Sequence, residues 1–185
     1  MRRLPVILIA LLAGPWARAA PSVWVADAGH GRLACYPSYE GQAFEAVFRH
    51  WTARLDWDAG TLEAEIRTGS LASGDPDRDR AMTAPEWLDA AGHPGARFRA
   101  RVVPRAGGFL AAGQLTLKGV TRPVTLPFTW EVRGGQARLR GETVFDRGDF
   151  GIGADEAAVG PSVRVVVDAR FRPVPGAGPP GESAP

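Results

Sequence analysis

A stretch near the middle of the chain alternates apolar and polar residues on both sides of a short corner. The apolar residues share one face of each arm: Leu115 and Leu117 before the corner, and Val124, Leu126 and Phe128 after it. Alternation with a period of two is typical of a β-strand that buries one face. Gly119 can supply a positive φ at the corner, and Pro123 fixes its own φ. The stretch therefore predicts an antiparallel hairpin with one buried and one solvated face.

The same alternation recurs along most of the chain and predicts about eight strands. The alternating segments fall in nine ranges: residues 23–27, 32–36, 43–57, 61–67, 96–103, 109–118, 121–132, 136–146 and 162–172. The run 43–57 changes phase between Phe48 and Trp51, which indicates a bulge or bend in a curved strand. Many strands at short spacing predict an all-β barrel or sandwich, and the pattern alone leaves both open.

Residues 74–80, between two strand-rich parts of the chain, are mostly charged and favour turns. Thr83 is an N-cap type of residue and stands two places before Pro85, as at many helix starts. We expect one or two short helices between Pro76 and Ala91.

The first residues have the pattern of a secretory signal peptide. Arg2 and Arg3 precede a short apolar run, and Ala17-Arg18-Ala19 fits a cleavage site. The run is too short to cross a bilayer, so we expect cleavage after Ala19 and no stable membrane insertion. The expected organisation is a signal peptide at 1–19, a β-domain at 20–172 and a disordered Pro/Gly-rich tail at 173–185.

The charge of the chain does not indicate a nucleic-acid-binding protein, and its cysteine content does not allow a disulfide-stabilised fold. Three of the 22 Lys and Arg residues lie in the leader, which leaves 19 against 20 Asp and Glu. A balanced charge does not favour nucleic acid as a partner. Cys35 is the single cysteine and cannot form an internal disulfide, so the fold depends on its core.

Residues suited to catalysis are few. The three histidines, His30, His50 and His93, show no zinc-ligand spacing with cysteine, and no Gly-x-Ser-x-Gly elbow occurs. Three aspartates alternate as in a calcium loop, but the later glycine and glutamate are missing, so a salt-bridged loop is expected there: Asp75, Asp77 and Asp79. We therefore expect no catalytic residue, no metal site, no cofactor and no enzymatic activity.

Several motifs in order resemble the YceI-like family of periplasmic, lipocalin-like barrels that bind long isoprenoid lipids. The matching segments are Leu115 to Val124, Arg78-Asp79, Glu86 to Asp89, His93 to Phe98, Phe145 to Ile152 and Val159 to Val163. The N-terminal third departs from the family pattern, because its usual strand histidine is missing. The resemblance implies one antiparallel eight-stranded barrel with a short helical insertion, exported to the periplasm.

The resemblance also implies an apolar channel that holds a polyprenyl or quinone-type amphiphile. The implied lining is Phe44, Phe48, Phe98, Leu115, Leu117, Phe128 and Trp130, and the arginines available for a polar head group are Arg78, Arg122 and Arg147. Inward aromatic residues of a sheet are more often plain core. A filled barrel that contacts an envelope partner, such as a membrane redox protein, therefore stays as the alternative interpretation. A hydrolase built on Asp/His pairs around His50 is a weaker one, and homodimer formation is left open.

Overall fold

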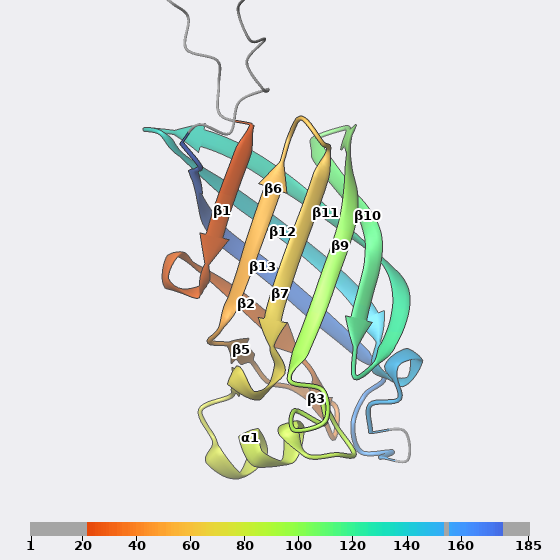
Figure 1. The fold of residues 1–185 in the computed structure, drawn as a ribbon. Helices are drawn as coiled ribbons and strands as arrows, with labels where there is room; N and C mark the ends of the chain where they lie inside the picture. The colour runs from red at the N-terminus through yellow and green to blue at the C-terminus, as the bar shows by residue number, and fades with distance from the viewer. Residues whose placement is uncertain (1–21, 154–155, 176–185) are drawn as a thin grey trace, which may run out of the picture.

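The protein is built from β-strands with short helical turns between them (Figure 1). The computed structural model describes residues 22–153 and 156–175. Its strands are β1 (Val23–Asp27), β2 (Gly31–Tyr36), β3 (Ser38–Tyr39), β4 (Gln42–Ala43), β5 (Ala46–Phe48), β6 (Trp51–Asp56), β7 (Thr61–Arg67), β8 (Leu71–Ala72), β9 (Gly95–Arg105), β10 (Gly108–Leu117), β11 (Val120–Arg133), β12 (Gln136–Asp146) and β13 (Ser162–Pro173). The helical elements are η1 (Ala28–His30), η2 (Thr68–Ser70), α1 (Pro76–Thr83) and η3 (Arg147–Phe150). Within these residues no helix has the length and apolar character needed to cross a membrane.

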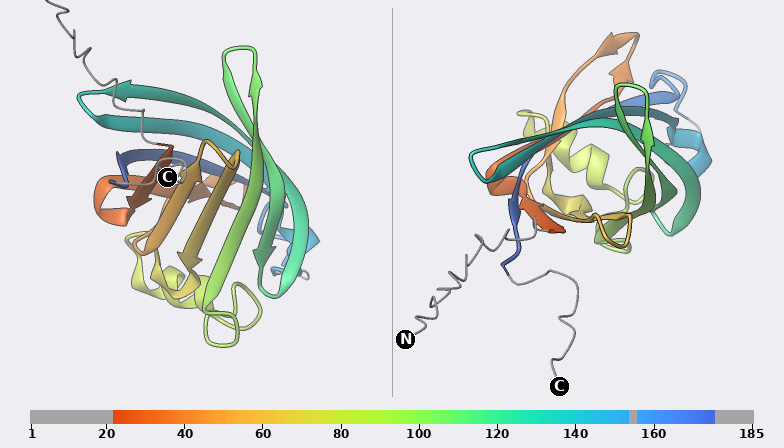
Figure 2. Two further views of the ribbon diagram at one scale, coloured as in Figure 1. Left: turned by 45° about the horizontal axis from the view of Figure 1, so that its top comes forward. Right: turned by 90° about the horizontal axis from the view of Figure 1, so that it is seen from above.

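The main sheet closes into a barrel. Among the described residues, eight antiparallel strands follow one another in the order β1-β6-β7-β9-β10-β11-β12-β13, and β13 pairs with β1 again. Seen from above, the strands surround a common interior (Figure 2). The predicted all-β class with a short helical insertion is confirmed, and pairing around a full circle decides for the barrel.

The first long strand of the barrel is broken into β1 and β2. At the break, Asp27 Oδ1 accepts a hydrogen bond of 2.9 Å from the Gly29 amide and lies 2.8 Å from His30 Nδ1. Gly31 then approaches β13 so closely that a Cβ would lie 2.6 Å from the Cα of Ala169. Arg172 and Pro173 of β13 pair with β1, whereas residues 164–169 pair with β2. The break therefore lets β2, β5 and β8 extend the wall toward α1.

The bend predicted between Phe48 and Trp51 is confirmed. β5 ends at Phe48, β6 begins at Trp51, and the two residues between them belong to neither strand. The Arg49 amide donates to the Ser70 carbonyl at 3.0 Å, and the His50 amide donates to Ser70 Oγ at 3.1 Å. Because the strand restarts after this break, Phe48 and Trp51 both line the interior although they are three residues apart.

The helical insertion begins earlier than Thr83. Asp75 is the N-cap of α1, and its carboxylate accepts from two backbone amides of the first turn. Thr83 is the last residue of the helix instead of its N-cap, and its hydroxyl donates back to the Asp79 carbonyl at 2.9 Å. One short helix therefore lies within the expected range from Pro76 to Ala91, whereas the helix start expected at Thr83 was wrong, and residues 84–94 contain turns and no helix.

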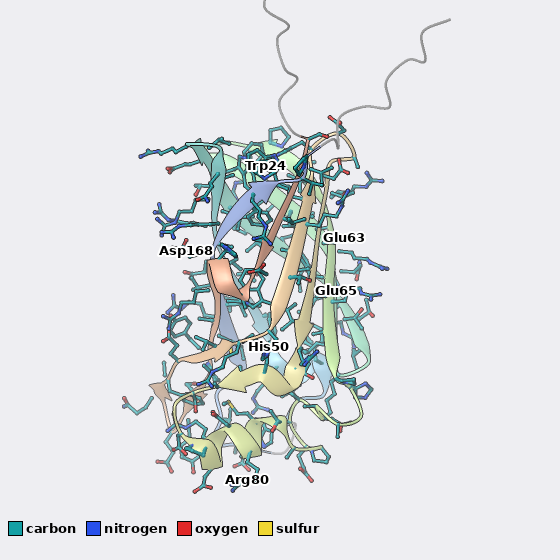
Figure 3. All side chains as sticks on the ribbon, turned by 60° about the vertical axis from the view of Figure 1, so that its left-hand side comes forward. Trp24, His50, Glu63, Glu65, Arg80 and Asp168 are labelled. Carbon is teal, nitrogen blue, oxygen red and sulfur yellow. The ribbon has the colours of Figure 1, made fainter. Side chains whose placement is uncertain are left out.

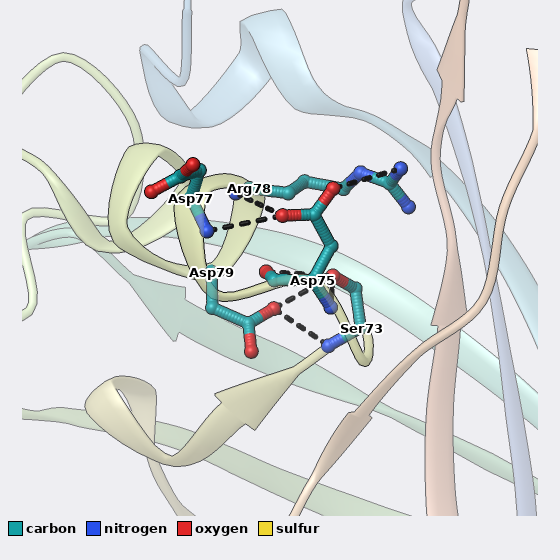
Figure 4. A network of polar contacts seen from close by, with 5 residues as sticks. All are labelled: Ser73, Asp75, Asp77, Arg78 and Asp79. Atoms are coloured by element: carbon teal, nitrogen blue, oxygen red, sulfur yellow. Dashed lines mark hydrogen bonds and ion pairs between the residues drawn. The ribbon is translucent and has the colours of Figure 1, made fainter.

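The alternating aspartates of this region are held by polar neighbours (Figure 4). Asp79 accepts from the Ser73 amide at 2.6 Å and from Ser73 Oγ at 2.7 Å, and these bonds hold the pKa of Asp79 below its ordinary value. Asp77 pairs with Arg80 at 2.7 Å. The described residues hold no cluster of three or more His, Cys, Asp or Glu that could bind a metal ion.

Aromatic side chains fill the end of the barrel far from α1. The rings of this aromatic plug are in contact with centroid separations of 4.8 to 5.5 Å: Trp24, Trp57, Phe109, Phe128, Trp130 and Phe171. Figure 3 shows Trp24 at this end. Such contacts add to the free energy that burial of the rings already contributes. The plug therefore closes one end of the barrel.

We expect Phe128→Ala to destabilise the fold by about 3 to 5 kcal/mol, the usual cost of truncating a packed core aromatic. Phe128 is buried and stacks on Phe109 at 5.5 Å. Urea unfolding measures the loss. Val132→Ala on the same strand is the control, because Val132 is exposed and its truncation should cost less than about 0.5 kcal/mol. Equal losses for both variants would contradict a packed plug.

Candidate ligand-binding cavity

The half of the barrel nearest α1 is hollow. A cavity of about 890 Å³ lies there, within the range of about 300 to 1,000 Å³ typical of small-molecule sites. Its wall is almost entirely apolar and includes Leu33, Phe48, Trp51, Ala64, Ile66, Phe98, Leu115, Leu117, Val124, Leu126, Val163, Val165 and Val167. The floor of the cavity includes Phe171, which also belongs to the aromatic plug. The cavity is thus blind at the plugged end.

The apolar residues predicted from the sequence divide into two sets. Phe44, Phe48, Phe98, Leu115 and Leu117 line the cavity, whereas Phe128 and Trp130 lie in the aromatic plug and not on the cavity wall. Alternation identifies which face of a strand points inward, but not how far along the barrel axis a residue lies. Phe128 and Trp130 share the inward face with Leu126 and sit beyond the cavity floor.

The three predicted arginines also differ in position. Arg78 and Arg147 line the cavity. Arg122 is exposed, is not part of the lining, and donates from Nη1 to the Thr121 carbonyl at 3.3 Å. The prediction of Arg122 as a head-group ligand therefore finds no support in its position.

Arg147 is a buried cation whose partners are backbone carbonyls. Its five N–H groups are donated to the carbonyl oxygens of Ile152, Gly153, Glu156, Val159 and Gly160. A guanidinium has five N–H donors in total, so none is left over. Burial of a charge is tolerated only when it is hydrogen-bonded in this way. Arg147 therefore shapes the irregular segment that forms one wall of the cavity.

The cavity reaches the surface at the end near α1. Its exposed lining residues belong to the β3–β4 hairpin, to α1 and to the segment after η3: Tyr39, Glu40, Gln42, Ala43, Ala81 and Glu156. The hairpin turns at Glu40 and Gly41, which have φ of 48° and 76°, as two-residue β-hairpins require. The Glu40 amide donates to the Ala158 carbonyl at 2.7 Å and anchors the hairpin. These three segments form the mouth of the cavity.

The corner of the central hairpin ties together the loops that close this end. Lys118 Nζ donates to the Glu86 carbonyl at 3.2 Å and to the Gly151 carbonyl at 3.0 Å. Trp87 packs on Gly153, where an added Cβ would lie 2.5 Å from the indole ring. Lys118 thereby connects the loop after α1 to the loop after η3, and both loops contribute to the cavity wall.

Cys35 faces the cavity as a small buried side chain. It lines the wall beside Leu33, and burial raises the pKa of its thiol to about 12. A thiol with so high a pKa stays protonated and is a poor nucleophile. Cys35 therefore contributes apolar surface to the cavity.

The histidine–carboxylate pairs lie away from the cavity. Among the described residues these contacts are His30 with Asp27 at 2.8 Å and His93 with Asp89 at 3.7 Å. His50 is exposed and does not line the cavity. His50 lies instead in a separate surface hollow that also includes Glu65, and among the described residues it forms no ion pair with a carboxylate, so the Asp/His pair that a hydrolase around His50 needs is not observed there.

Several lining residues were not identified from the sequence. Trp51 was missed because the bend in the strand reverses its facing, and Trp87 and Met82 because they lie in a segment without strand periodicity. Tyr39 was missed because the β3 and β4 strands are too short to carry an alternation. The one local signal for that hairpin was Gly41 directly after Glu40, because a glycine is common in a two-residue hairpin turn.

A closed antiparallel barrel with an apolar cavity open at one end is the architecture of a small-ligand-binding barrel. Comparison with known proteins identifies the family to which this barrel belongs. A family model described as the YceI-like domain matches residues 24–171. The chain is 31% identical over 157 residues to a UPF0312 protein of Pseudomonas savastanoi pv. phaseolicola, with 77% of this chain and 82% of that protein covered. The chain therefore belongs to the YceI-like family.

Solved structures show the same fold. BcnA of Burkholderia cenocepacia is 22% identical with a TM-score of 0.73, and the match covers 78% of this chain and 98% of BcnA. A polyisoprenoid binding domain from Saccharophagus degradans, described as implicated in plant cell wall breakdown, is 14% identical with a TM-score of 0.68 and coverage of 84% and 100%. The YceI protein of Campylobacter jejuni is 10% identical with a TM-score of 0.52, with 92% and 98% covered. The lipocalin-like barrel inferred from the sequence motifs is confirmed.

Replacing Arg147 should unfold the segment that it organises. Arg147→Gln leaves several buried carbonyl oxygens without a donor, and we expect a loss of more than about 2 kcal/mol in the free energy of unfolding. Urea unfolding measures the loss, and limited proteolysis should cut the segment between residues 151 and 160. The exposed Arg122→Gln is the matched control and should stay within about 0.5 kcal/mol of wild type. A stable, uncut Arg147→Gln would contradict the structural role.

The raised pKa of Cys35 predicts a specific loss of stability in alkali. The unfolded chain loses the thiol proton near its ordinary pKa of 9.0, whereas the folded chain keeps it up to about 12. Stability is therefore fully present below pH 9 and decreases as the pH rises through this window. Between pH of about 8 and about 10, unfolding free energy should fall by about 1.4 kcal/mol more for wild type than for Cys35→Ala. Parallel profiles for the two proteins would disprove the shift.

Proposed function

We propose that the protein binds an elongated apolar lipid of the isoprenoid class, a polyprenyl or quinone-type amphiphile. The observation that carries the proposal is the apolar cavity, blind at the aromatic plug and open at the mouth. A lipid that enters tail first removes apolar surface from water, and each Å² contributes about 25 cal/mol. The description of the Saccharophagus relative as a polyisoprenoid binding domain supports this ligand class.

The proposed role is to carry or sequester the lipid in the periplasm, without chemistry on it. Export rests on the signal-peptide pattern of residues 1–19, which lie outside the described residues. The proposed mature domain spans 20–172, and most of the expected tail at 173–185 also lies outside the described residues.

The alternative of a barrel filled by its own side chains fits only the plugged half. The cavity next to α1 has room for a ligand, and its mainly apolar lining suits an apolar one. Lipid binding therefore accounts for more of the structure than a surface that contacts an envelope partner.

Native mass spectrometry of protein purified from its own host tests the proposal. We expect about one lipid per chain, identified as an isoprenoid after organic extraction, and a polypeptide mass that shows cleavage after Ala19. Ala64→Phe places a ring in the cavity and should lower lipid occupancy about tenfold. The ring takes up space that the ligand needs, and the close-packed wall cannot move outward to restore it.

Glu65→Phe is the matched control, on the outer face of the same strand. Glu65 points away from the barrel in Figure 3 and pairs with Arg97 at 2.7 Å. Its replacement should leave lipid occupancy unchanged. An empty wild-type protein that also fails to take up added quinone or polyprenyl alcohol would refute lipid binding and direct the search to a protein partner.

A further inference from the structure

The charges at the mouth constrain the head group of the ligand. Among the described residues, the charged side chains that line the cavity are Glu40, Arg78, Arg147 and Glu156. An anionic head group such as a diphosphate needs several cationic or N–H donors that converge on it. The donors that these residues can still offer therefore decide which head groups fit.

Arg147 has no donor to offer. All five of its N–H groups are donated to backbone carbonyls of the segment after η3. The guanidinium also lies 5.7 Å from the centroid of the Trp87 ring. A head group would have to break the wall of the cavity to form a hydrogen bond with Arg147.

Arg78 has donors to offer, but its charge is already balanced. Its Nη2 lies 3.5 Å from Asp75 Oδ2 (Figure 4). Its guanidinium carbon lies 4.4 Å from the centroid of the Phe44 ring at the cavity wall. Asp75 is fixed as the N-cap of α1, so this carboxylate stays beside Arg78. The pair can donate a hydrogen bond to a ligand oxygen without presenting a net positive charge.

Two further carboxylates stand at the mouth. Glu40 lies at the turn of the β3–β4 hairpin and Glu156 in the segment after η3, and both are exposed residues of the cavity lining. Like charges repel, and because both carboxylates are exposed, their repulsion of an anion is moderate and depends on the salt concentration. A diphosphate brings at least two negative charges to this place.

We infer that the mouth selects an uncharged head group, a hydroxyl or carbonyl oxygen that accepts a hydrogen bond from Arg78, and discriminates against a diphosphate through Glu40 and Glu156. The inference rests on the proposed lipid binding and narrows its ligand to prenyl alcohols and quinones.

Competition with one prenyl chain that carries two different heads tests the inference. Farnesol and farnesyl diphosphate, each below its micelle concentration, displace a fluorescent apolar probe from the purified mature protein. Farnesol should bind about tenfold more tightly. Raising the salt concentration from about 0.02 M to about 0.5 M should narrow this ratio, because salt screens the repulsion of the diphosphate.

Variants of the charged residues at the mouth test which of them discriminate between farnesol and farnesyl diphosphate. The double variant Glu40→Gln, Glu156→Gln should bind farnesyl diphosphate about tenfold more tightly than wild type, so that its affinities for farnesol and farnesyl diphosphate become nearly equal. Glu63→Gln is the control, since Glu63 lies on the outer face of β7 and contacts Arg99 at 3.8 Å (Figure 3). Arg78→Met should weaken farnesol about fivefold by removing the donor.

The outcomes separate the two proposals. Diphosphate that binds as tightly as farnesol in wild type, or that the double variant does not improve, overturns the head-group inference and leaves lipid binding intact. Farnesol affinity that does not fall in Arg78→Met overturns the assignment of Arg78. If neither compound displaces the probe, lipid binding itself is refuted and the inference falls with it.

Discussion

The structure depends on the way in which β13 pairs with two strands at once. Its last residues pair with β1 and its middle pairs with β2, so the sheet closes and also grows beyond the level of β1. Closure removes the exposed edges of a sheet, but it creates an interior that side chains must either fill or line. Here they do both: packed aromatic rings fill the end that β1 closes, and a mixture of aliphatic and aromatic side chains lines the hollow end that β2, β5 and β8 extend.

Two cations hold the irregular segments that complete the cavity. Arg147 donates to five carbonyl oxygens between Ile152 and Gly160, and Lys118 joins two loops that are distant in sequence. Buried carbonyl groups outside regular structure need such donors. A planar guanidinium with five donors can serve five carbonyls, which the single ammonium of a lysine cannot do.

Features that depend on residues close together in the sequence were mostly predicted correctly, and features that depend on distant residues mostly were not. The face of a strand is a local property, so the shared inward face of Leu115 and Leu117 was found from alternation, and the bend after Phe48 was found from a change of phase. Depth along the barrel is not local. Phe98 and Phe128 both point inward, yet one lines the cavity and the other lies in the plug. The strand register and the tilt of the barrel decide between them.

The fold and the cavity show the same difference between local and long-range features. The chain by itself determined the all-β class, the central hairpin and the motifs of the YceI-like family, because these follow from period-two patterning and from turn residues a few positions apart. Tertiary structure alone decided that one half is hollow, that Arg147 is saturated by carbonyls while Arg78 keeps free donors, and that Glu40 meets the cavity. Those features arise where segments far apart in sequence meet, and no local pattern encodes the distance between them.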